Sequence, residues 1–156
     1  FRNISGQEIQ KKCFKEQLFI AQKINKPVII HNRNSDKDMI KILLEFPDVI
    51  GVAHCFSSDL EMANKFLDIG YYISFSGNLT FKNSHLPMVA KELPLDRILV
   101  ETDSPFLSPE PFRGKSNEPG RVRYVAEKLA EIYSISFEKI AEITSNNPSK
   151  LFNLND

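Results

Sequence analysis

The feature that most constrains the fold is a repeated alternation between short, largely apolar runs and segments with helical spacing. Four such runs lie at residues 28–30, 49–53, 71–76 and 97–101. A short run of consecutive apolar residues suits a strand that is buried on both faces, as strands are in a parallel sheet. Strands that alternate with helices along the chain predict an α/β architecture with a parallel sheet.

The segments around these runs carry apolar residues three and four positions apart, which is the spacing of one helix face. They predict helices over residues 7–22, 35–46, 59–68, 87–93, 121–133 and 136–144. A loop rich in Pro, Gly and Ser spans residues 104–120. The chain of 156 residues shows no linker and no low-complexity tract, so we expect residues 1–156 to form one domain.

Polar side chains gather where the apolar runs end. His31 and His54 follow the first two runs directly, and Asp103 comes two residues after the last. The carboxyl ends of parallel strands share one edge of the sheet, and active sites form at that edge. Two imidazoles and a carboxylate are usual ligands of a hydrolytic divalent metal, which lowers the pKa of a bound water. The pattern predicts a metal site of His31, His54 and Asp103, with Asp103 also able to accept a proton from that water.

The histidines and Cys55 also have purely structural interpretations. A single histidine at a strand end is more often a hydrogen-bonded structural residue, but two at equivalent strand ends together with Asp103 favour a site. His85 lies in a polar run before Pro87 and is interpreted as part of a surface loop. Cys55 could act as a nucleophile, but a small buried residue is the favoured interpretation.

Basic and aromatic residues near the expected loops could contact a phosphate or a base. Arg33, two residues after His31, suits two-point phosphate binding or, equally, a solvent-facing ion pair. The basic segment 111–119 could hold phosphates, cover the site or simply connect two elements, although loops this long are uncommon unless functional. Three phenylalanines could stack on bases, namely Phe56, Phe81 and Phe112.

The charge balance excludes one mode of nucleic-acid binding. Twenty basic and twenty acidic residues leave a formal net charge of zero, so no long-range basic field attracts a polyanion, and any such contact must be local.

No apolar run approaches the roughly 18 residues of a membrane span, and no signal peptide is visible. The two cysteines form neither a disulfide framework nor a zinc pattern. We therefore expect a cytoplasmic protein without a membrane partner.

Four motifs, in this order, resemble those of the TatD family of metal-dependent hydrolases. They are VIIHNR at 28–33, GVAHCFS at 51–57, ISFSG at 73–77 and LVETDSP at 99–105. The ending NNPSKLF at 146–152 is similar to the last helix of that family. The second and fourth motifs together, at this spacing, are the most specific part of the resemblance.

The resemblance implies a TIM-type (β/α) barrel, of which this chain supplies four βα units and therefore about the second half. Residues 1–156 would be the C-terminal part of a single TatD-like domain. By this resemblance His31 and His54 bind one metal, and Asp103 binds a second metal or the attacking water. Arg33 contacts substrate phosphate, and Glu101 supports Asp103 and the loop that follows it without binding the metal itself. The implied cofactors are divalent ions (Mg²⁺, Mn²⁺ or Zn²⁺), two in the complete protein. The implied activity is that of a deoxyribonuclease acting on DNA, often from the 3′ end, or on another phosphodiester.

The chain also departs from the family pattern, because the His-x-His motif of the first strand is absent and a bridging Glu of the fourth strand would fall before Phe1. Residues 1–6 resemble the loop that follows that fourth strand. A half barrel would have two open edges and one bare apolar face, which favour self-association. Two other functions therefore stay open, a non-catalytic remnant that mediates interaction or oligomerisation, and an amidohydrolase-like enzyme that cleaves C–N bonds. Arg33 and the basic segment favour phosphate.

Overall fold

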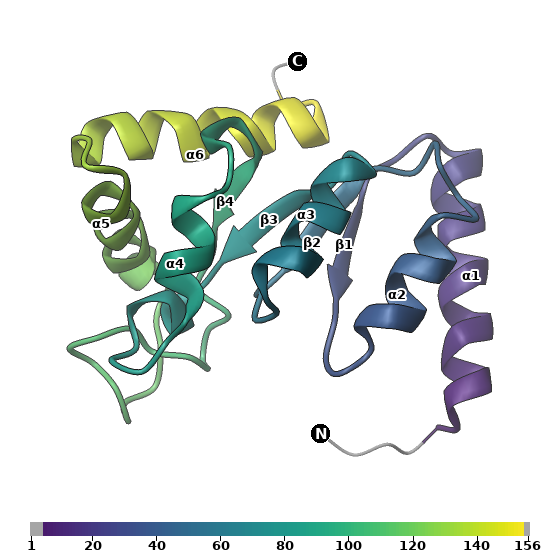
Figure 1. Cartoon of the computed structure of the whole chain (residues 1–156), viewed down its shortest axis with the longest axis horizontal. Helices are drawn as coiled ribbons and strands as arrows, with labels where there is room; N and C mark the ends of the chain where they lie inside the picture. The colour runs from purple at the N-terminus through teal and green to yellow at the C-terminus, as the bar shows by residue number, and fades with distance from the viewer. Residues whose placement is uncertain (1–4, 155–156) are drawn as a thin grey trace.

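Four parallel strands lie side by side in the order in which the chain reaches them, β1-β2-β3-β4 (Figure 1). The structure is a computed structural model and describes residues 5–154. The strands are β1 (Val28–His31), β2 (Gly51–His54), β3 (Tyr72–Phe75) and β4 (Ile98–Val100). The helices are α1 (Gln7–Lys23), α2 (Asp36–Leu43), α3 (Leu60–Asp68), α4 (Leu86–Lys91), α5 (Val122–Tyr133) and α6 (Phe137–Phe152). Short 3-10 turns lie at η1 (Gly77–Thr80), η2 (Leu95–Arg97) and η3 (Pro119–Arg121).

This arrangement confirms the predicted α/β architecture and its four βα units. Most predicted elements agree with the structure to within a few residues at each end. The predicted likeness of residues 1–6 to a loop falls largely outside the described residues. None of the helices within residues 5–154 has both the length and the apolar character needed to cross a bilayer.

The register of the sheet separates its side chains into two sets. His31 pairs with His54, and Ser74 pairs with Leu99. Because successive side chains point to opposite faces of a strand, Ile30, Ala53 and Ile73 all pack into the main core beneath the helices. The other face, which we call the inner face, is apolar near the strand starts and polar at the carboxyl edge. Its residues are Ile29, Val52, Tyr72 and Leu99, followed by His31, His54, Ser74 and Glu101.

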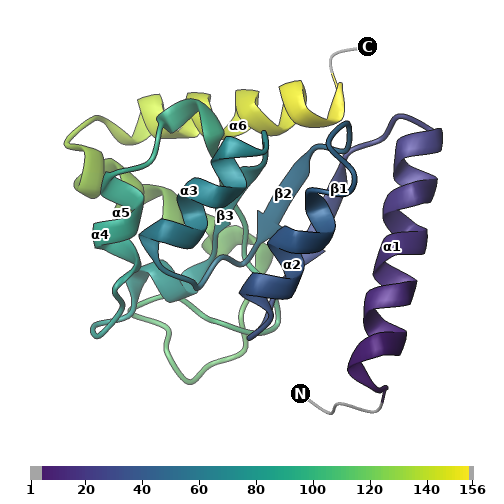
Figure 2. The same cartoon turned by 45° about the vertical axis from the view of Figure 1, so that its right-hand side comes forward.

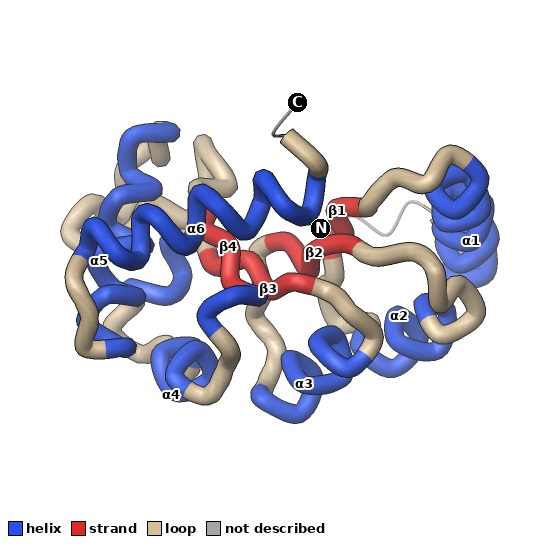
Figure 3. The backbone as a smooth tube through the Cα atoms, turned by 90° about the horizontal axis from the view of Figure 1, so that it is seen from above, coloured by secondary structure: helices blue, strands red, loops and turns tan. Residues whose placement is uncertain are grey.

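Helices cover the two faces unequally. Figure 3 shows α2, α3 and α4 on one side of the strands and α6 across the other. At the end of α6, Leu151 and Phe152 pack against Val52, Tyr72 and Leu99 on the inner face. The expectation of a bare apolar face is therefore wrong over β2 to β4, whereas Ile29 on edge strand β1 remains 66% exposed.

Helix α6 also runs beyond its predicted end at residue 144, through Pro148, to Phe152. A proline inside a helix costs roughly 3 kcal/mol, which is why the sequence pattern stops earlier. Burial of Leu151, which is 5% exposed, contributes roughly 1.5–3 kcal/mol in the opposite direction. Asn147 adds two hydrogen bonds from Nδ2, to the carbonyls of Leu95 and Ile98, both 2.8 Å long. Tertiary contacts thus offset the local preference.

The first helix stands beside α2 at the β1 end of the sheet (Figure 2). Leu18 and Ala21 bury one side of α1 in the main core. Two exposed ion pairs join the helices, Lys11 with Asp38 at 3.0 Å and Lys15 with Glu45 at 2.7 Å. Exposed pairs of this kind contribute about 0–1 kcal/mol each, so the apolar contact determines the position of α1.

We expect Gly77→Ala to destabilise the protein by about 1–3 kcal/mol, the usual cost of overpacking. A Cβ at Gly77 would lie 1.8 Å from the carbonyl oxygen of Leu107 and 2.9 Å from the nitrogen of Pro109, so the loop after β4 would have to move. Chemical denaturation of the two proteins measures the difference. Gly120→Ala is the matched control, because a Cβ there meets nothing within 4 Å. Equal stability of the two variants would contradict this close approach.

Candidate metal centre at the carboxyl edge

Three side chains of the inner face form a hydrogen-bonded group at the carboxyl edge. The Nδ1 atom of His54 lies 2.8 Å from Oε1 and 2.9 Å from Oε2 of Glu101, and the N–H direction makes Oε2 the acceptor. Ser74 donates its hydroxyl proton to the same Oε2 over 2.7 Å. Oε1 of Glu101 is buried and accepts no hydrogen bond from the described residues. The hydrogen bond from Nδ1 fixes the orientation of the ring and leaves Nε2 for another partner.

The Nε2 atom of His54 faces Oδ1 of Asp103 at 3.3 Å. In a neutral ring that donates from Nδ1, both of these atoms are acceptors, so a proton or a cation must lie between them. The hydrogen bond to Glu101 raises the pKa of His54 against the effect of burial, and the charges of Glu101 and Asp103 raise it further. A divalent cation is the alternative to the proton, because metal–ligand distances of about 2.0–2.2 Å place two tetrahedral ligands about 3.3–3.6 Å apart. The two atoms therefore fit a metal.

His31 lies at the end of edge strand β1, beside His54. The centroids of the two rings are 5.9 Å apart, and the His31 side chain is exposed. The structure thus brings the three predicted ligands, His31, His54 and Asp103, to one edge. Within residues 5–154, however, no group of three or more His, Cys, Asp or Glu side chains forms a metal-holding cluster. The ligand assignment stays a prediction, and these residues would supply only part of a coordination shell.

Local backbone geometry explains how Asp103 reaches this position. Strand β4 ends at Val100, and Asp103 takes a left-handed conformation with φ of 57°. Aspartate tolerates this region better than most residues, because its short polar side chain can satisfy nearby backbone groups. Its carbonyl accepts a hydrogen bond from the Phe106 amide over 2.8 Å, which closes the turn.

Glu101 supports a different partner from the one we expected. The resemblance assigned it to Asp103, whereas the carboxylate binds His54 and Ser74. Sequence reasoning included Ser74 in the motif at 73–77 but gave it no role. The available signal was alternation within β3, since Ser74 is a polar residue between Ile73 and Phe75, both fully buried in the main core.

Arg33 and Cys55 are near neighbours in the chain of His31 and His54. Arg33 is exposed beyond the end of β1, where its predicted contact with phosphate stays a prediction. Burial raises the pKa of the Cys55 thiol to about 11, while its contact with the Ser76 hydroxyl at 3.2 Å and the charge of Arg33 lower it. A thiol with this pKa is rarely ionised at neutral pH, which favours the interpretation of Cys55 as a packing residue.

The long loop after β4 is held by residues that sequence reasoning did not identify. Asn117 is 5% exposed, and its Nδ2 donates to the carbonyls of Thr102 and Phe106, both over 2.8 Å. Arg121 donates to the hydroxyl of Ser108 over 2.7 Å. These bonds tie the loop to the segment that carries Asp103. No spacing in the sequence reveals them, because an asparagine in a Pro- and Gly-rich loop has many ordinary uses.

His85 was interpreted as a surface-loop residue, and its side chain is exposed immediately before α4. Its Nε2 atom lies 3.0 Å from the carbonyl oxygen of Ser58. In the described part of the chain, His85 makes no hydrogen bond to the group around His54.

Comparison with known proteins gives a consistent result. A profile of the family described as "TatD related DNase" matches residues 1–153. The chain is 47% identical over 154 residues to the uncharacterized metal-dependent hydrolase YabD of Bacillus subtilis, covering 97% of this chain and 60% of that protein. It is 47% identical over 148 residues to the uncharacterized metal-dependent hydrolase YcfH of Escherichia coli, covering 93% and 56%. The chain thus spans a little over half the length of these relatives.

Solved structures confirm the TIM-type fold prediction. The TatD homolog YjjV of Escherichia coli superposes with a TM-score of 0.87 at 32% identity, over 96% of this chain and 60% of that one. A TatD family hydrolase from Entamoeba histolytica superposes with a TM-score of 0.84 at 23% identity, over 95% and 58%, and this likeness concerns the fold alone.

We expect Glu101→Gln to weaken Mn²⁺ binding by about 10- to 100-fold, the usual effect of removing a carboxylate behind a metal-binding histidine. The amide can donate to Nδ1 of His54 and so favour the wrong tautomer. Calorimetric titration with Mn²⁺ measures the change. Glu16→Gln, an exposed glutamate on α1, is the control and should bind as the unchanged protein does. An unaltered Mn²⁺ affinity in Glu101→Gln would show that Glu101 does not contribute to metal binding.

Proposed function

This chain belongs to the TatD related DNase family, and from that premise we propose that the protein is a divalent-metal-dependent hydrolase of phosphodiester bonds. We propose DNA as its substrate, with cleavage from the 3′ end. The observation that carries the proposal is the approach of Nε2 of His54 to Oδ1 of Asp103 at the carboxyl edge, 3.3 Å apart. When the ring is neutral and donates from Nδ1, both atoms are acceptors, so a cation can bind between them.

The proposed ligands from this chain are His31, His54 and Asp103. The donor set suits Mg²⁺, Mn²⁺ or Zn²⁺. A bound divalent ion supplies Lewis-acid stabilisation of the phosphoryl oxygens and lowers the pKa of water. The remaining ligands, and a second ion, would depend on the part of the family's barrel that this chain does not span.

Other residues of the edge would orient the reactants. Glu101 holds His54 in the tautomer that leaves Nε2 available. Asp103 would accept a proton from the attacking water. Arg33, exposed beside His31 at the same edge, would bind a substrate phosphate through two parallel hydrogen bonds.

We expect chelation, His54→Ala and Asp103→Asn each to lower kcat/KM on the order of a hundredfold or more, because each removes stabilisation of the charge that develops at phosphorus. Hydrolysis of single-stranded DNA labelled at its 3′ or 5′ end, with Mg²⁺ or Mn²⁺ present, measures both rate and direction. Asp96→Asn is the control, since Asp96 is an exposed aspartate just before the start of β4, at the opposite end of that strand from Asp103.

Full activity in both site variants would exclude this assignment. Hydrolysis of a cyclic amide without any cleavage of DNA would instead support the C–N hydrolase alternative.

A further inference from the structure

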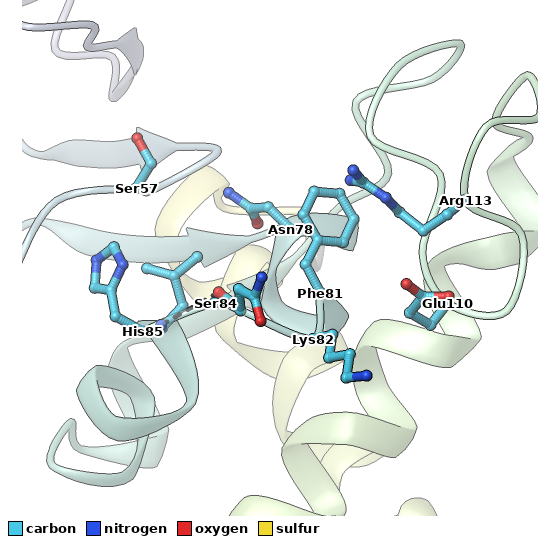
Figure 4. Close-up of a pocket in the computed structure, with 10 residues that line it drawn as sticks. Ser57, Asn78, Phe81, Lys82, Ser84, His85, Glu110 and Arg113 are labelled. Atoms are coloured by element: carbon cyan, nitrogen blue, oxygen red, sulfur yellow. Dashed lines mark hydrogen bonds between the residues drawn. The ribbon is translucent and has the colours of Figure 1, made fainter.

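A pocket of about 390 Å³ opens among the loops that follow β2, β3 and β4 (Figure 4). Its walls come from the loop after β2, the turn after β3, the start of α4 and the long loop after β4. The lining residues that matter here are Ser57, Asn78, Phe81, Lys82, Glu110 and Arg113. The group around His54 does not include any of them.

The pocket lies near the proposed site. Ser57 follows His54 by three residues, which limits the distance between their Cα atoms to about 11 Å. Asn78 accepts a hydrogen bond from Ser76 over 3.0 Å, and Ser76 contacts Cys55 at 3.2 Å. The pocket is therefore within reach of a chain molecule whose bond is cleaved at the edge.

One contact gives the pocket its chemical character. The guanidinium carbon of Arg113 stands 3.6 Å from the centre of the Phe81 ring, and Figure 4 shows the two side chains facing each other. Stacking on a ring leaves the N–H groups at the edge of a guanidinium free to bind phosphate, and it orders the side chain before any ligand arrives. Arg113 and Phe81 thus form a preorganised platform.

The remaining lining residues fit an anion that carries a flat group. Lys82 is an exposed cation next to Phe81 in the chain, and Glu110 is the single carboxylate among the lining residues. Ser57 and Asn78 are neutral. Ring and guanidinium planes stack on unpaired bases, whereas cations bind phosphates, and a nucleotide has both parts.

We propose that this pocket is a subsite for one nucleotide of a single strand, next to the bond that is cleaved. The base stacks on the Phe81–Arg113 pair, and Arg113 and Lys82 bind its phosphate. The identity of the ligand rests on the proposed function, but the binding itself can be measured without catalysis.

The test is binding of a short fluorescent DNA strand in the presence of a chelator, by anisotropy, at several salt concentrations. Arg113→Gln should weaken binding about tenfold and reduce the slope of log K against log salt by about 0.7, the contribution of one single-strand phosphate contact. Phe81→Leu should weaken binding to a similar extent, about tenfold, and leave the slope unchanged, because it removes only stacking.

Arg123→Gln is the matched control. Arg123 also stands over an aromatic ring, that of Phe137 at 5.4 Å, but it lies on α5 and pairs with Glu127. It should change neither affinity nor slope. Thermal unfolding of each variant checks that the fold is kept, and Arg113 is exposed, so its substitution leaves the core intact.

The outcomes separate the subsite from the proposed function. If Arg113→Gln and Phe81→Leu bind DNA as the unchanged protein does, the subsite is wrong, even when bis(4-nitrophenyl) phosphate is hydrolysed with metal. If both lose affinity as stated and no phosphodiester is cleaved under any metal, the subsite stands and the proposed function fails. If both proposals hold, Arg113→Gln loses about ten times more kcat/KM on DNA than on the small diester.

Discussion

The register between parallel strands is the constraint on which the rest of the structure depends. Side chains alternate along a strand, so a shift of one residue would turn His54 into the core and bring Ala53 to the inner face. The apolar side chains beneath the helices prevent that shift, because Ile73 and Ile98 are fully buried there as register partners. The packing of the core beneath the helices thus determines which polar side chains meet on the inner face.

Features set by local sequence could be predicted, and features set by distant contacts could not. Apolar runs revealed the strands, and their ends revealed that His31, His54 and Asp103 share an edge. The hydrogen bond between His54 and Glu101 joins residues 47 positions apart, and no sequence pattern identifies the carboxylate that accepts from His54. The same holds for Asn117 and for the contact between Phe81 and Arg113, since both depend on how the long loop folds back.

At the end of α6, a local preference against helix competes with the free energy gained from tertiary contacts. Pro148 opposes a helix, and sequence spacing therefore predicts an earlier end. Leu151 can leave water only if the helix continues to the inner face, where Val52 and Leu99 are also apolar. Sequence spacing reflects only the effect of Pro148, because the surface that receives Leu151 is assembled from strands remote in the chain.

The anchoring of the long loop has a kinetic consequence. Asn117 holds its far end, Arg121 holds Ser108 and the backbone at Ser116, and the bare Cα of Gly77 lets Leu107 lie against the turn after β3. These contacts hold the segment at several points, which favours a fixed rim over a loop that opens and closes. A strand bound in the proposed subsite would therefore associate without waiting for a loop to close, at a rate set by diffusion and charge. Its dissociation rate would depend on the contacts that it breaks.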